Sequence, residues 1–452
     1  MPASMPTDVT NSEEAGVQYP ASRASLPEIY SSLAVPHSAT FLRKLFAFAG
    51  PGFLIAVGYM DPGNWATDLA AGSKYNYALL SVIMLSNLMA ILLQALAVKL
   101  GVVTGRDLAQ ACRENFSRPV SFSLWILAEI AIAACDLAEV IGSAIALNLL
   151  FHIPLLLGVC LTALDVLLIL VLQSKSFRFI EALVITLIAT VTVCFGLEVL
   201  FSHPGMEGLA KSFFVPPAQL FRDREMLYIA ISILGATVMP HNLYLHSAIV
   251  QTRNFERTPT GKREAIRFGT IDSTVALTIA LVVNAAILVV SAATFYSRGY
   301  NQVAEIQDAY KLLSPLLGVA GASTIFALAL LASGQNSTLT GTLAGQVVME
   351  GFLNIRLRPW LRRLITRGLA IVPAILVTAF WGERGTANLL VFSQVILSLQ
   401  LSFAVFPLVM FTNDKKKMGE FANAAWLKSL AWIAAAFIAV LNTWYLIGLM
   451  HI

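Results

Sequence analysis

Long apolar runs dominate this sequence. Each contains roughly 20 or more residues, the length that a helix needs to cross the hydrocarbon core of a bilayer, and short polar stretches separate them. Of the 452 residues, 57% are hydrophobic and only 12% are charged, and the mean hydropathy is +0.75, which is far more apolar than a soluble domain. The strands of a membrane barrel would instead alternate apolar and polar residues. The sequence therefore predicts an all-α polytopic membrane protein.

The apolar runs predict eleven transmembrane helices. Their approximate limits are 45–72, 77–101, 119–147, 154–173, 179–201, 226–252, 270–295, 316–347, 364–381, 388–411 and 425–450. Residues 203–225 and 298–315 are polar and contain Pro or Gly, which is typical of longer loops outside the membrane. Residues 1–44 have the composition of a disordered cytoplasmic tail, and 413–452 comprise a cytoplasmic loop and the last span.

Lys and Arg residues are concentrated in alternate loops. In short loops such residues favour the cytoplasmic side of the membrane. The enriched loops precede the first span and follow the second, fourth, sixth, eighth and tenth, and their basic residues are Arg43, Lys44, Arg106, Arg113, Arg118, Lys175, Arg178, Arg253, Arg257, Lys262, Arg263, Arg267, Arg356, Arg358, Arg362, Arg363 and Lys415 to Lys417. We therefore expect a cytoplasmic N-terminus and an extracellular C-terminus. The compact loops and the lack of a visible targeting segment favour the plasma membrane of a bacterium.

The first ten spans form two groups of five, at 45–202 and 226–412, joined by an extracellular loop at 203–225. Because each group has an odd number of spans, the second enters the membrane from the opposite side, which predicts an inverted repeat. The first and sixth spans occupy corresponding positions, and helix-breaking residues interrupt both. Paired breaks of this kind indicate a transporter binding site near the middle of the membrane.

The first break has the sequence Asp61-Pro62-Gly63-Asn64. Pro62 removes a backbone donor and clashes with the preceding turn, and Gly63 weakens the helix further. Carbonyls freed in this way must face protein, water or an ion, because leaving them in hydrocarbon costs several kcal/mol each. Asp61 and Asn64 add side-chain oxygens at the same point. A proline kink with a capping Asp is the alternative, but a charge at membrane depth usually has a function.

The second break lies in the sixth span, between Gly235 and Pro240. Pro240 leaves the carbonyl of Ala236, four residues earlier, without its usual partner. Met239 lies beside the break, although a methionine in a membrane helix most often serves packing alone. If the two breaks face each other, they offer a carboxylate, a carboxamide oxygen, a backbone carbonyl and a thioether sulfur. Calcium and magnesium prefer oxygen ligands only, so the sulfur favours softer first-row metals.

Together the two motifs carry a resemblance. Asp-Pro-Gly-Asn at 61–64 and Met-Pro-His-Asn-Leu-Tyr-Leu-His-Ser at 239–247 resemble the Nramp family of proton-coupled divalent metal transporters, with similarity from about Leu42 to the end of the eleventh span. The resemblance implies a leucine-transporter-type fold and uptake of manganese(II) or iron(II), with cadmium and cobalt also accepted. It further implies metal ligands at Asp61, Asn64, the Ala236 carbonyl and Met239. Magnesium- and aluminium-transporting relatives lack this methionine, which favours a transition metal.

Three acids in the third span suggest a proton path. Glu129, Asp136 and Glu139 are spaced by seven and three residues, which places them on one helical stripe about 80° wide and about 15 Å long. Ion pairing with a neighbouring helix is the alternative. Both interpretations hold if the arginines at the start of the ninth span pair with the acids and mark the inner exit; these are Arg362, Arg363 and Arg367. In the resembling family, residues that match Asp61, Asp136, Glu139 and His241 are linked to proton movement.

Other polar residues in the spans have weaker assignments. His241 and His246 are five residues apart and point about 140° away from each other on a helix, so they are not expected to share a metal. Asn284 in the seventh span and Gln394 in the tenth could complete the coordination of a metal, or form packing hydrogen bonds. The family usually has proline where this chain has Ser402. That difference can alter the bend of the tenth helix and the position of Gln394.

These observations favour a secondary active importer of divalent transition metals that is driven by proton entry. We expect the metal ion, the proton and the lipid bilayer as its only partners, without a cofactor, a nucleic acid or an obligate protein partner. An uncoupled metal channel and a sodium-coupled carrier for organic solutes of the same fold are the alternatives, although Asp61 would repel an anionic substrate. A membrane metalloenzyme is disfavoured, because the chain lacks His-Glu-x-x-His, Gly-x-Ser-x-Gly and P-loop motifs.

Overall fold

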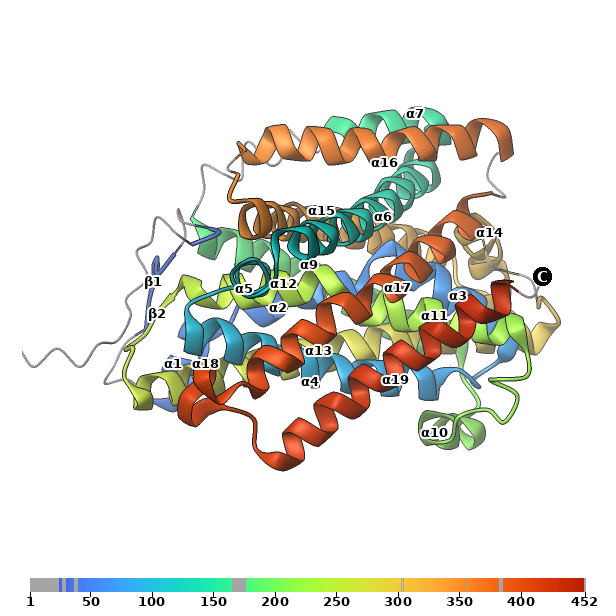
Figure 1. Ribbon diagram of the computed structural model, residues 1–452. Helices are drawn as coiled ribbons and strands as arrows, with labels where there is room; N and C mark the ends of the chain where they lie inside the picture. The colour runs from blue at the N-terminus through green and yellow to red at the C-terminus, as the bar shows by residue number, and fades with distance from the viewer. Residues whose placement is uncertain are drawn as a thin grey trace, which may run out of the picture.

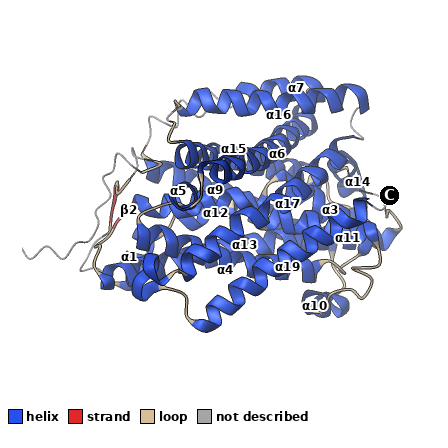
Figure 2. Ribbon diagram, in the orientation of Figure 1, coloured by secondary structure: helices blue, strands red, loops and turns tan. Residues whose placement is uncertain are grey.

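Helices make up almost all of the computed structural model, which describes residues 24–26, 30–35, 40–164, 176–301, 303, 305–355, 357–381 and 385–450. Within these residues the only strands are β1 (Leu33–Ala34) and β2 (Arg253–Asn254), which pair in parallel (Figures 1 and 2). The chain is therefore an all-helical protein, as the apolar runs predicted.

The helices of the first half are short around the first break and long elsewhere. They are α1 (Phe41–Phe48), α2 (Pro51–Ala56), η2 (Gly58–Met60), α3 (Pro62–Tyr75), α4 (Leu80–Thr104), α5 (Leu108–Asn115), α6 (Arg118–Phe151), α7 (Leu155–Leu161), η3 (Thr162–Leu164) and α9 (Phe177–Ser202). Those of the second half are α10 (Met206–Phe214), α11 (Arg224–Thr237), α12 (Pro240–Ile249), η4 (Val250–Thr252), α13 (Pro259–Thr294), η5 (Tyr296–Arg298), α14 (Ile306–Leu317), α15 (Ala322–Leu353), α16 (Pro359–Trp381), α17 (Thr386–Asn413), α18 (Lys415–Met418), η7 (Gly419–Phe421) and α19 (Ala425–Met450).

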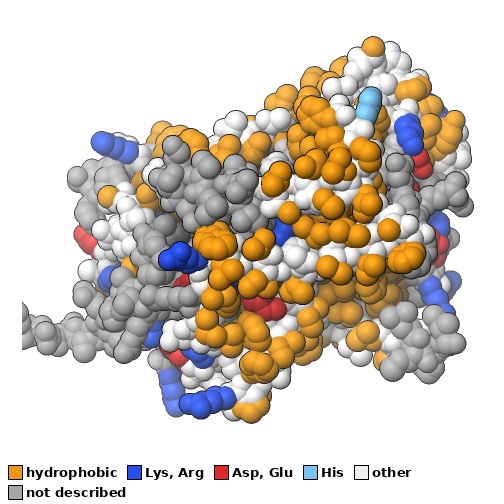
Figure 3. All heavy atoms as spheres, turned by 90° about the horizontal axis from the view of Figure 1, so that it is seen from above, with side chains coloured by type: hydrophobic (Ala, Val, Ile, Leu, Met, Phe, Trp, Pro, Cys, Tyr) orange, Lys and Arg blue, Asp and Glu red, His pale blue; other side chains and the backbone are white. Residues whose placement is uncertain are grey.

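Eight helices in the described part of the chain are long and apolar enough to cross a membrane. A ninth span results if α1 and the α2–η2 segment, which are bent relative to each other, are counted together. Hydrophobic side chains cover the middle of the face seen over α7 and α16, while the charged ones lie mostly toward its two ends (Figure 3). The chain is therefore a multi-pass membrane protein. Eleven spans were predicted. The predicted eighth span corresponds to the 32-residue helix α15, which is rich in Ser, Thr, Asn and Gln, and the predicted fourth span continues into residues that lie outside the described part.

Two segments predicted as loops contain helices. Helix α10 lies within 203–225, and helix α14 overlaps 298–315 and extends past it. Both are amphipathic: Leu209 and Phe213 of α10 pack against the apolar core, and Ile306 and Leu313 of α14 are buried. Composition alone missed them because their other faces are polar, so the average over each segment is typical of a loop.

The described parts of the predicted tail, 1–44, are also structured. Ser25 Oγ donates to Asp107 Oδ2 at 2.5 Å, β1 pairs with β2, and α1 begins at Phe41. The prediction of a disordered tail is therefore wrong for these residues. Residues 1–23, 27–29 and 36–39 lie outside the described part of the chain.

The core consists of long helices that cross the bundle side by side. Helix α6 packs against α15, α16 and α17; α13 packs against α3 and α4; and α11 packs against α17. Trp65 of α3 is fully buried, with ring centroids 4.7 Å from Phe195 and 5.1 Å from Phe326 in edge-to-face contacts. This packing holds the start of α3, where the first break lies, against α9 and α15.

Candidate functional site

The first break separates η2 from α3. Helix η2 ends at Met60, Asp61 is extended with φ −71° and ψ 168°, and α3 starts at Pro62. Proline suits this first helical position because its missing N–H would have no intrahelical acceptor there. The Asp61 carboxylate caps α3, since Oδ1 accepts from Asn64 N at 2.8 Å. A capping aspartate at membrane depth therefore results directly from the local sequence.

The second break separates α11 from α12 in the same way. Helix α11 ends at Thr237, Val238 and Met239 are non-helical, and α12 starts at Pro240. The break exposes the last carbonyls of α11, which carry the partial negative charge of a helix C-terminus. Such an end favours a cation.

Hydrogen bonds join the two breaks. Asn64 Nδ2 donates to the Ala236 carbonyl oxygen at 3.1 Å and to Asp61 Oδ1 at 2.8 Å. Asn284 Nδ2 of α13 donates to Asn64 Oδ1 at 3.2 Å. Met239 of the second break lies close to η2, the helix that precedes the first break. A Cβ built on Gly58 of η2 would be 3.0 Å from Met239 Sδ. Residues from four separate segments thus meet at one buried point.

Gln394 of α17 reaches this point because two glycines make room for it. A Cβ on Gly63 would lie 2.0 Å from Gln394 Nε2, and a Cβ on Gly235 would lie 2.0 Å from the Gln394 carbonyl oxygen. Real Cβ atoms do not approach other atoms so closely, so any side chain at either position would displace Gln394 or its helix. The sequence assigned both glycines to the breaks, and the structure gives them this second, steric role.

Three acceptor oxygens at this point have no hydrogen-bond partner in the described part of the chain. They are Asp61 Oδ2, Gln394 Oε1 and Asn284 Oδ1, and all three side chains are buried. A buried acceptor without a donor is costly unless a cation or water satisfies it. With the Ala236 carbonyl and the Met239 sulfur nearby, the donor set mixes hard oxygen with one soft ligand, which suits a first-row transition metal. No group of three or more His, Cys, Asp or Glu residues placed to hold a metal occurs among the described residues, so any metal site here depends on amide, carbonyl and thioether ligands in addition to the Asp61 carboxylate.

A second buried cluster lies beside the breaks. Gln94 Nε2 of α4 donates to the Tyr59 hydroxyl at 2.8 Å, and Gln94 Oε1 lies 3.0 Å from His246 Nδ1 of α12. All three side chains are fully buried. His246 therefore contacts an amide and not the site, whereas His241 Nε2 lies 3.8 Å from Cys135 Sγ. The two histidines diverge, as their spacing indicated.

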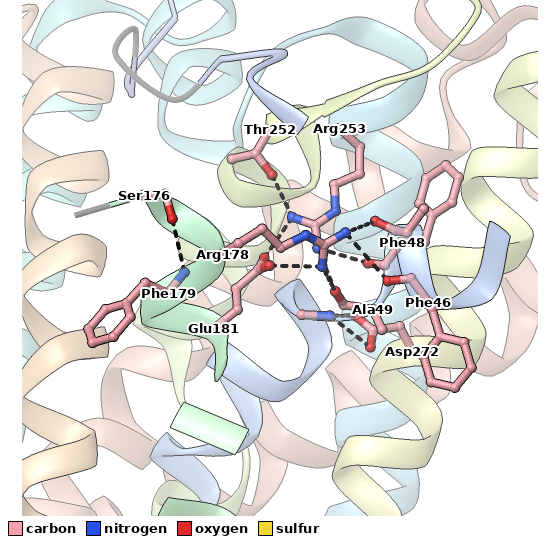
Figure 4. Close-up of polar contacts among 12 residues, drawn as sticks. Phe46, Phe48, Ala49, Ser176, Arg178, Phe179, Glu181, Thr252, Arg253 and Asp272 are labelled. Atoms are coloured by element: carbon pink, nitrogen blue, oxygen red, sulfur yellow. Dashed lines mark hydrogen bonds and ion pairs between the residues drawn. The ribbon is translucent and has the colours of Figure 1, made fainter. Parts of the chain in front are cut away.

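Arg253 holds the α1–α2 junction to the rest of the bundle. Its Nη1 donates to Glu181 Oε1 of α9 at 2.7 Å, and its Nη2 donates to the Ala49 carbonyl at 2.7 Å (Figure 4). Asp272 of α13 accepts from the next backbone groups, with Oδ2 2.6 Å from Gly52 N. Gly50 is required here, because its φ is +139° and a Cβ would lie 2.3 Å from Glu181 Cδ.

The third-span acids have arginine partners on α16. Arg362 Nη2 lies 3.0 Å from Glu129 Oε1, and Arg367 Nη1 lies 3.6 Å from Glu139 Oε2. Arg367 Nη1 also donates to the Asp136 carbonyl at 3.2 Å. These contacts match the ion-pairing interpretation of the stripe and leave its use by protons as a prediction. The side chain of Arg363 lies outside the described part of the chain.

Glycines of α15 give this chain of charges its space. A Cβ on Gly341 would lie 2.8 Å from Glu139 Oε1, and one on Gly345 would lie 1.6 Å from Arg362 Nη1. Thr338 of the same helix donates to Glu139 Oε2 at 3.4 Å and accepts from Arg367 Nη2 at 2.9 Å. The polar side chains of α15, the helix that covers most of the predicted eighth span, thus serve the buried charges.

Residues 52–448 match the family described as natural resistance-associated macrophage protein-like, or Nramp. The chain belongs to the Nramp family. The match covers both breaks, the α6 acids and the α16 arginines, so the resemblance suggested by the two short motifs is confirmed over most of the sequence.

Among curated relatives of this Nramp chain are proteins named divalent metal cation transporter MntH. The protein from Listeria welshimeri is 66% identical over 422 residues, covering 93% of this chain and 94% of the relative. The one from Nostoc sp. is 66% identical over 428 residues, covering 95% and 97%. Among solved structures, the Eremococcus coleocola manganese transporter in complex with an aromatic bis-isothiourea substituted compound has a TM-score of 0.86 at 43% identity, covering 93% of this chain and 90% of that one. Mhp1, a nucleobase-cation-symport-1 family transporter, has a TM-score of 0.58 at 14% identity, which shows a shared fold alone.

Sequence reasoning missed two clusters in this Nramp chain. The Tyr59–Gln94–His246 cluster and the Arg253–Glu181–Asp272 network each join helices that are far apart in the sequence. One signal was available for the second: Glu181 and Asp272 are carboxylates within predicted spans, and such residues require partners. Arg253 was assigned to topology alone, whereas its side chain is 0% exposed.

Proposed function

We propose that this chain is a secondary active transporter that imports divalent transition metal ions, manganese or iron, by alternating access coupled to proton entry. The meeting of the two breaks carries the proposal: Asn64, Asp61, the Ala236 carbonyl, Met239 and Gln394 come together from α3, α11, α17 and the breaks. Asp61 Oδ2 and Gln394 Oε1, like Asn284 Oδ1 beside them, lack donors in the described part of the chain, and the sulfur favours a soft cation. The MntH relatives support the same substrate class.

The proposed architecture has eleven spans, the first ten of which form a leucine-transporter-type inverted repeat. The two breaks begin their second halves with proline at equivalent positions, Pro62 and Pro240, which supports the repeat. The likeness of fold to Mhp1 supports it as well. In this topology the N-terminus is cytoplasmic and the C-terminus is extracellular, because basic residues gather at the α1, α5 and α18 end of the bundle.

Alternating access requires two barriers that open in turn. We assign the cytoplasmic barrier to the Arg253 network and the Tyr59–Gln94–His246 cluster. Arg253, Glu181 and Asp272 hold the α1–α2 junction through backbone atoms at Ala49 and Gly52, so release of these bonds would free the junction to move. Metal bound at the breaks would leave on that side once both sets of contacts have opened.

For the coupling ion we propose a route along α6. Asp61 at the site, then Glu139 and Glu129 with their arginine partners, would carry protons from the metal site toward the cytoplasm. The Sγ atom of Cys135 lies beside this route, 3.8 Å from Glu139 Oε1 and 3.8 Å from His241 Nε2. Arginine partners hold the two acids in place, since Arg362 pairs with Glu129 and Arg367 with Glu139.

Reconstituted vesicles provide the test. Uptake of manganese, cadmium, magnesium and calcium is measured with and without an imposed proton gradient, and the internal pH is followed. We expect manganese and cadmium to enter faster when the outside is acidic and the vesicle interior to acidify with them. Manganese entry without acidification would indicate a channel, and leucine or sodium uptake without manganese uptake would indicate a solute carrier.

A further inference from the structure

An apolar slot lies between α4, α11 and α19, at the end of the bundle where α10 contacts α4 (Figure 1). Its volume is about 340 Å³, within the range of roughly 300–1,000 Å³ that small-molecule sites occupy. Leu88 of α4, Leu234 of α11 and Phe437 of α19 form its walls, and Phe214 of α10 lies at its end. Apart from two serines of α4, the lining residues described are apolar.

The slot runs along a membrane span. Its lining on α4 extends from Ser81 to Met89, which is about 12 Å at about 1.5 Å per residue. Leu85 and Leu88 on this stretch are 46% and 54% exposed. Because α4 is one of the helices that can cross the membrane, these side chains face hydrocarbon. Water in such a slot would lack hydrogen-bond partners, so the material that fills it must be apolar.

A second cavity adjoins the slot and has a different character. Its volume is about 650 Å³, and it shares Phe221 with the slot. Its lining includes Arg222, Arg224, Glu225, Trp444 and Tyr445. Tryptophan and tyrosine prefer the level of lipid headgroups, so this cavity lies where the slot reaches the membrane surface.

The two arginines here have no ion-pair partner within the described residues, and both are exposed. The neighbouring carboxylates are already engaged. Glu225 forms an ion pair with Lys74, and Asp223 caps α11 by accepting from the backbone N–H groups of Glu225 and Met226. Two cations therefore remain at the mouth of an apolar slot, and the ligand that complements them carries negative charge on one end of a hydrocarbon chain.

We propose that a phospholipid with an anionic headgroup occupies both cavities. One acyl chain lies in the slot between α4, α11 and α19, and the phosphate lies between Arg222 and Arg224. Leu234 of the slot wall precedes Ala236, whose carbonyl faces the metal site, by two residues on the same helix, so the lipid supports the half of α11 that ends at the site. This lipid site is separate from the site for metal transport. It depends on the proposed topology in one respect, which is that the topology places the lipid in the outer leaflet.

Photo-crosslinking in vesicles of phosphatidylcholine with a minority of phosphatidylglycerol tests the proposal. One of the two lipids at a time carries a diazirine on its acyl chain, and labelled peptides are identified by mass spectrometry. We expect phosphatidylglycerol to label the 81–89 stretch of α4 and the Phe437 region of α19 several-fold more than phosphatidylcholine does. Equal labelling by both lipids, or labelling spread evenly over all lipid-facing helices, would overturn the proposal.

Variants test separately the apolar slot and its mouth, which is the second cavity. Val82→Trp, which fills the slot, should abolish the preferential labelling, whereas Val282→Trp on the lipid-facing side of α13 should leave it unchanged. Arg222→Gln with Arg224→Gln should reduce phosphatidylglycerol labelling to the level of phosphatidylcholine, whereas Arg298→Gln should not. Retained preference in both slot and mouth variants would contradict the assignment. The labelling is read without any transport, so a failed metal assay and a failed lipid assay remain distinct results.

Discussion

Asn64 Nδ2 lies 3.1 Å from the Ala236 carbonyl oxygen, so a hydrogen bond connects the two breaks across 172 residues of sequence. The same amide nitrogen is 2.8 Å from Asp61 Oδ1. For Asn64 to present its oxygen to a cation at this point, the amide must turn and release both bonds. The hydrogen bond between Asn64 and Ala236 thus links occupation of the site to the relative position of α3 and α11.

Replacement of Asp61 by alanine should abolish manganese binding. Asp61 is the one carboxylate at the meeting point of the breaks, and its Oδ2 has no donor in the described structure. Calorimetry of the purified variant measures the loss. Asp308→Ala, at an exposed carboxylate of α14, should bind as the original chain does. Normal affinity in Asp61→Ala would place the site elsewhere.

Replacement of Met239 by alanine should leave manganese transport measurable but weaken discrimination against calcium and magnesium. The thioether is the only soft ligand proposed, and hard cations bind oxygen ligands equally well without it. Competition of each cation with manganese uptake in vesicles provides the measurement. Met349→Ala removes another buried methionine, on α15, and should keep the original discrimination. Identical selectivity in the two variants would argue against the assigned role.

Replacement of Gly235 by alanine should reduce both stability and transport. The new Cβ would lie 2.0 Å from the Gln394 carbonyl oxygen, which is backbone and cannot rotate away, so α17 must shift. Overpacking of this kind costs about 1–3 kcal/mol. Gly196→Ala is the control, because a Cβ there has nothing within 4 Å and helix propensity favours alanine. The thermal midpoint in detergent and the rate of manganese uptake are compared, and equal values for both variants would refute the steric role.

Replacement of Arg253 by glutamine should destabilise the closed α1–α2 junction. Breaking a buried ion pair from one side costs up to about 3–5 kcal/mol when the other charge stays buried, here Glu181 at 2% exposed, which would keep only the pair with Arg178 at 3.1 Å. Arg263→Gln breaks an exposed pair with Glu420, worth about 0–1 kcal/mol, and serves as the control. Thermal unfolding measures both. Adding Glu181→Gln to Arg253→Gln should recover part of the loss, and an additive further loss would mean that the two residues are not coupled.

The family and the helical, membrane-spanning class followed from local sequence. The structural effects of an apolar run, and of Pro62 and Pro240, extend over only a few residues along the chain. The order of residues therefore indicates both the spans and the breaks. The amphipathic α10 and α14 escaped notice because composition averaged over a segment hides which face is apolar. Among the described helices, fewer are apolar enough to count as spans than the eleven predicted, and one reason is that α15, the predicted eighth span, carries polar residues that serve its buried partners and not the bilayer.

By itself, then, the sequence determined the membrane-spanning helical class, the two breaks and the residue types that could bind a metal. Only the tertiary structure decided that Asn64 reaches the Ala236 carbonyl, that Gln394 enters between Gly63 and Gly235, and that Arg253 pairs with Glu181. Each of these depends on two helices approaching to within a few ångströms. Two helices can approach so closely where a glycine has no side chain between them and where a buried charge requires a partner. Both conditions depend on how the whole bundle packs.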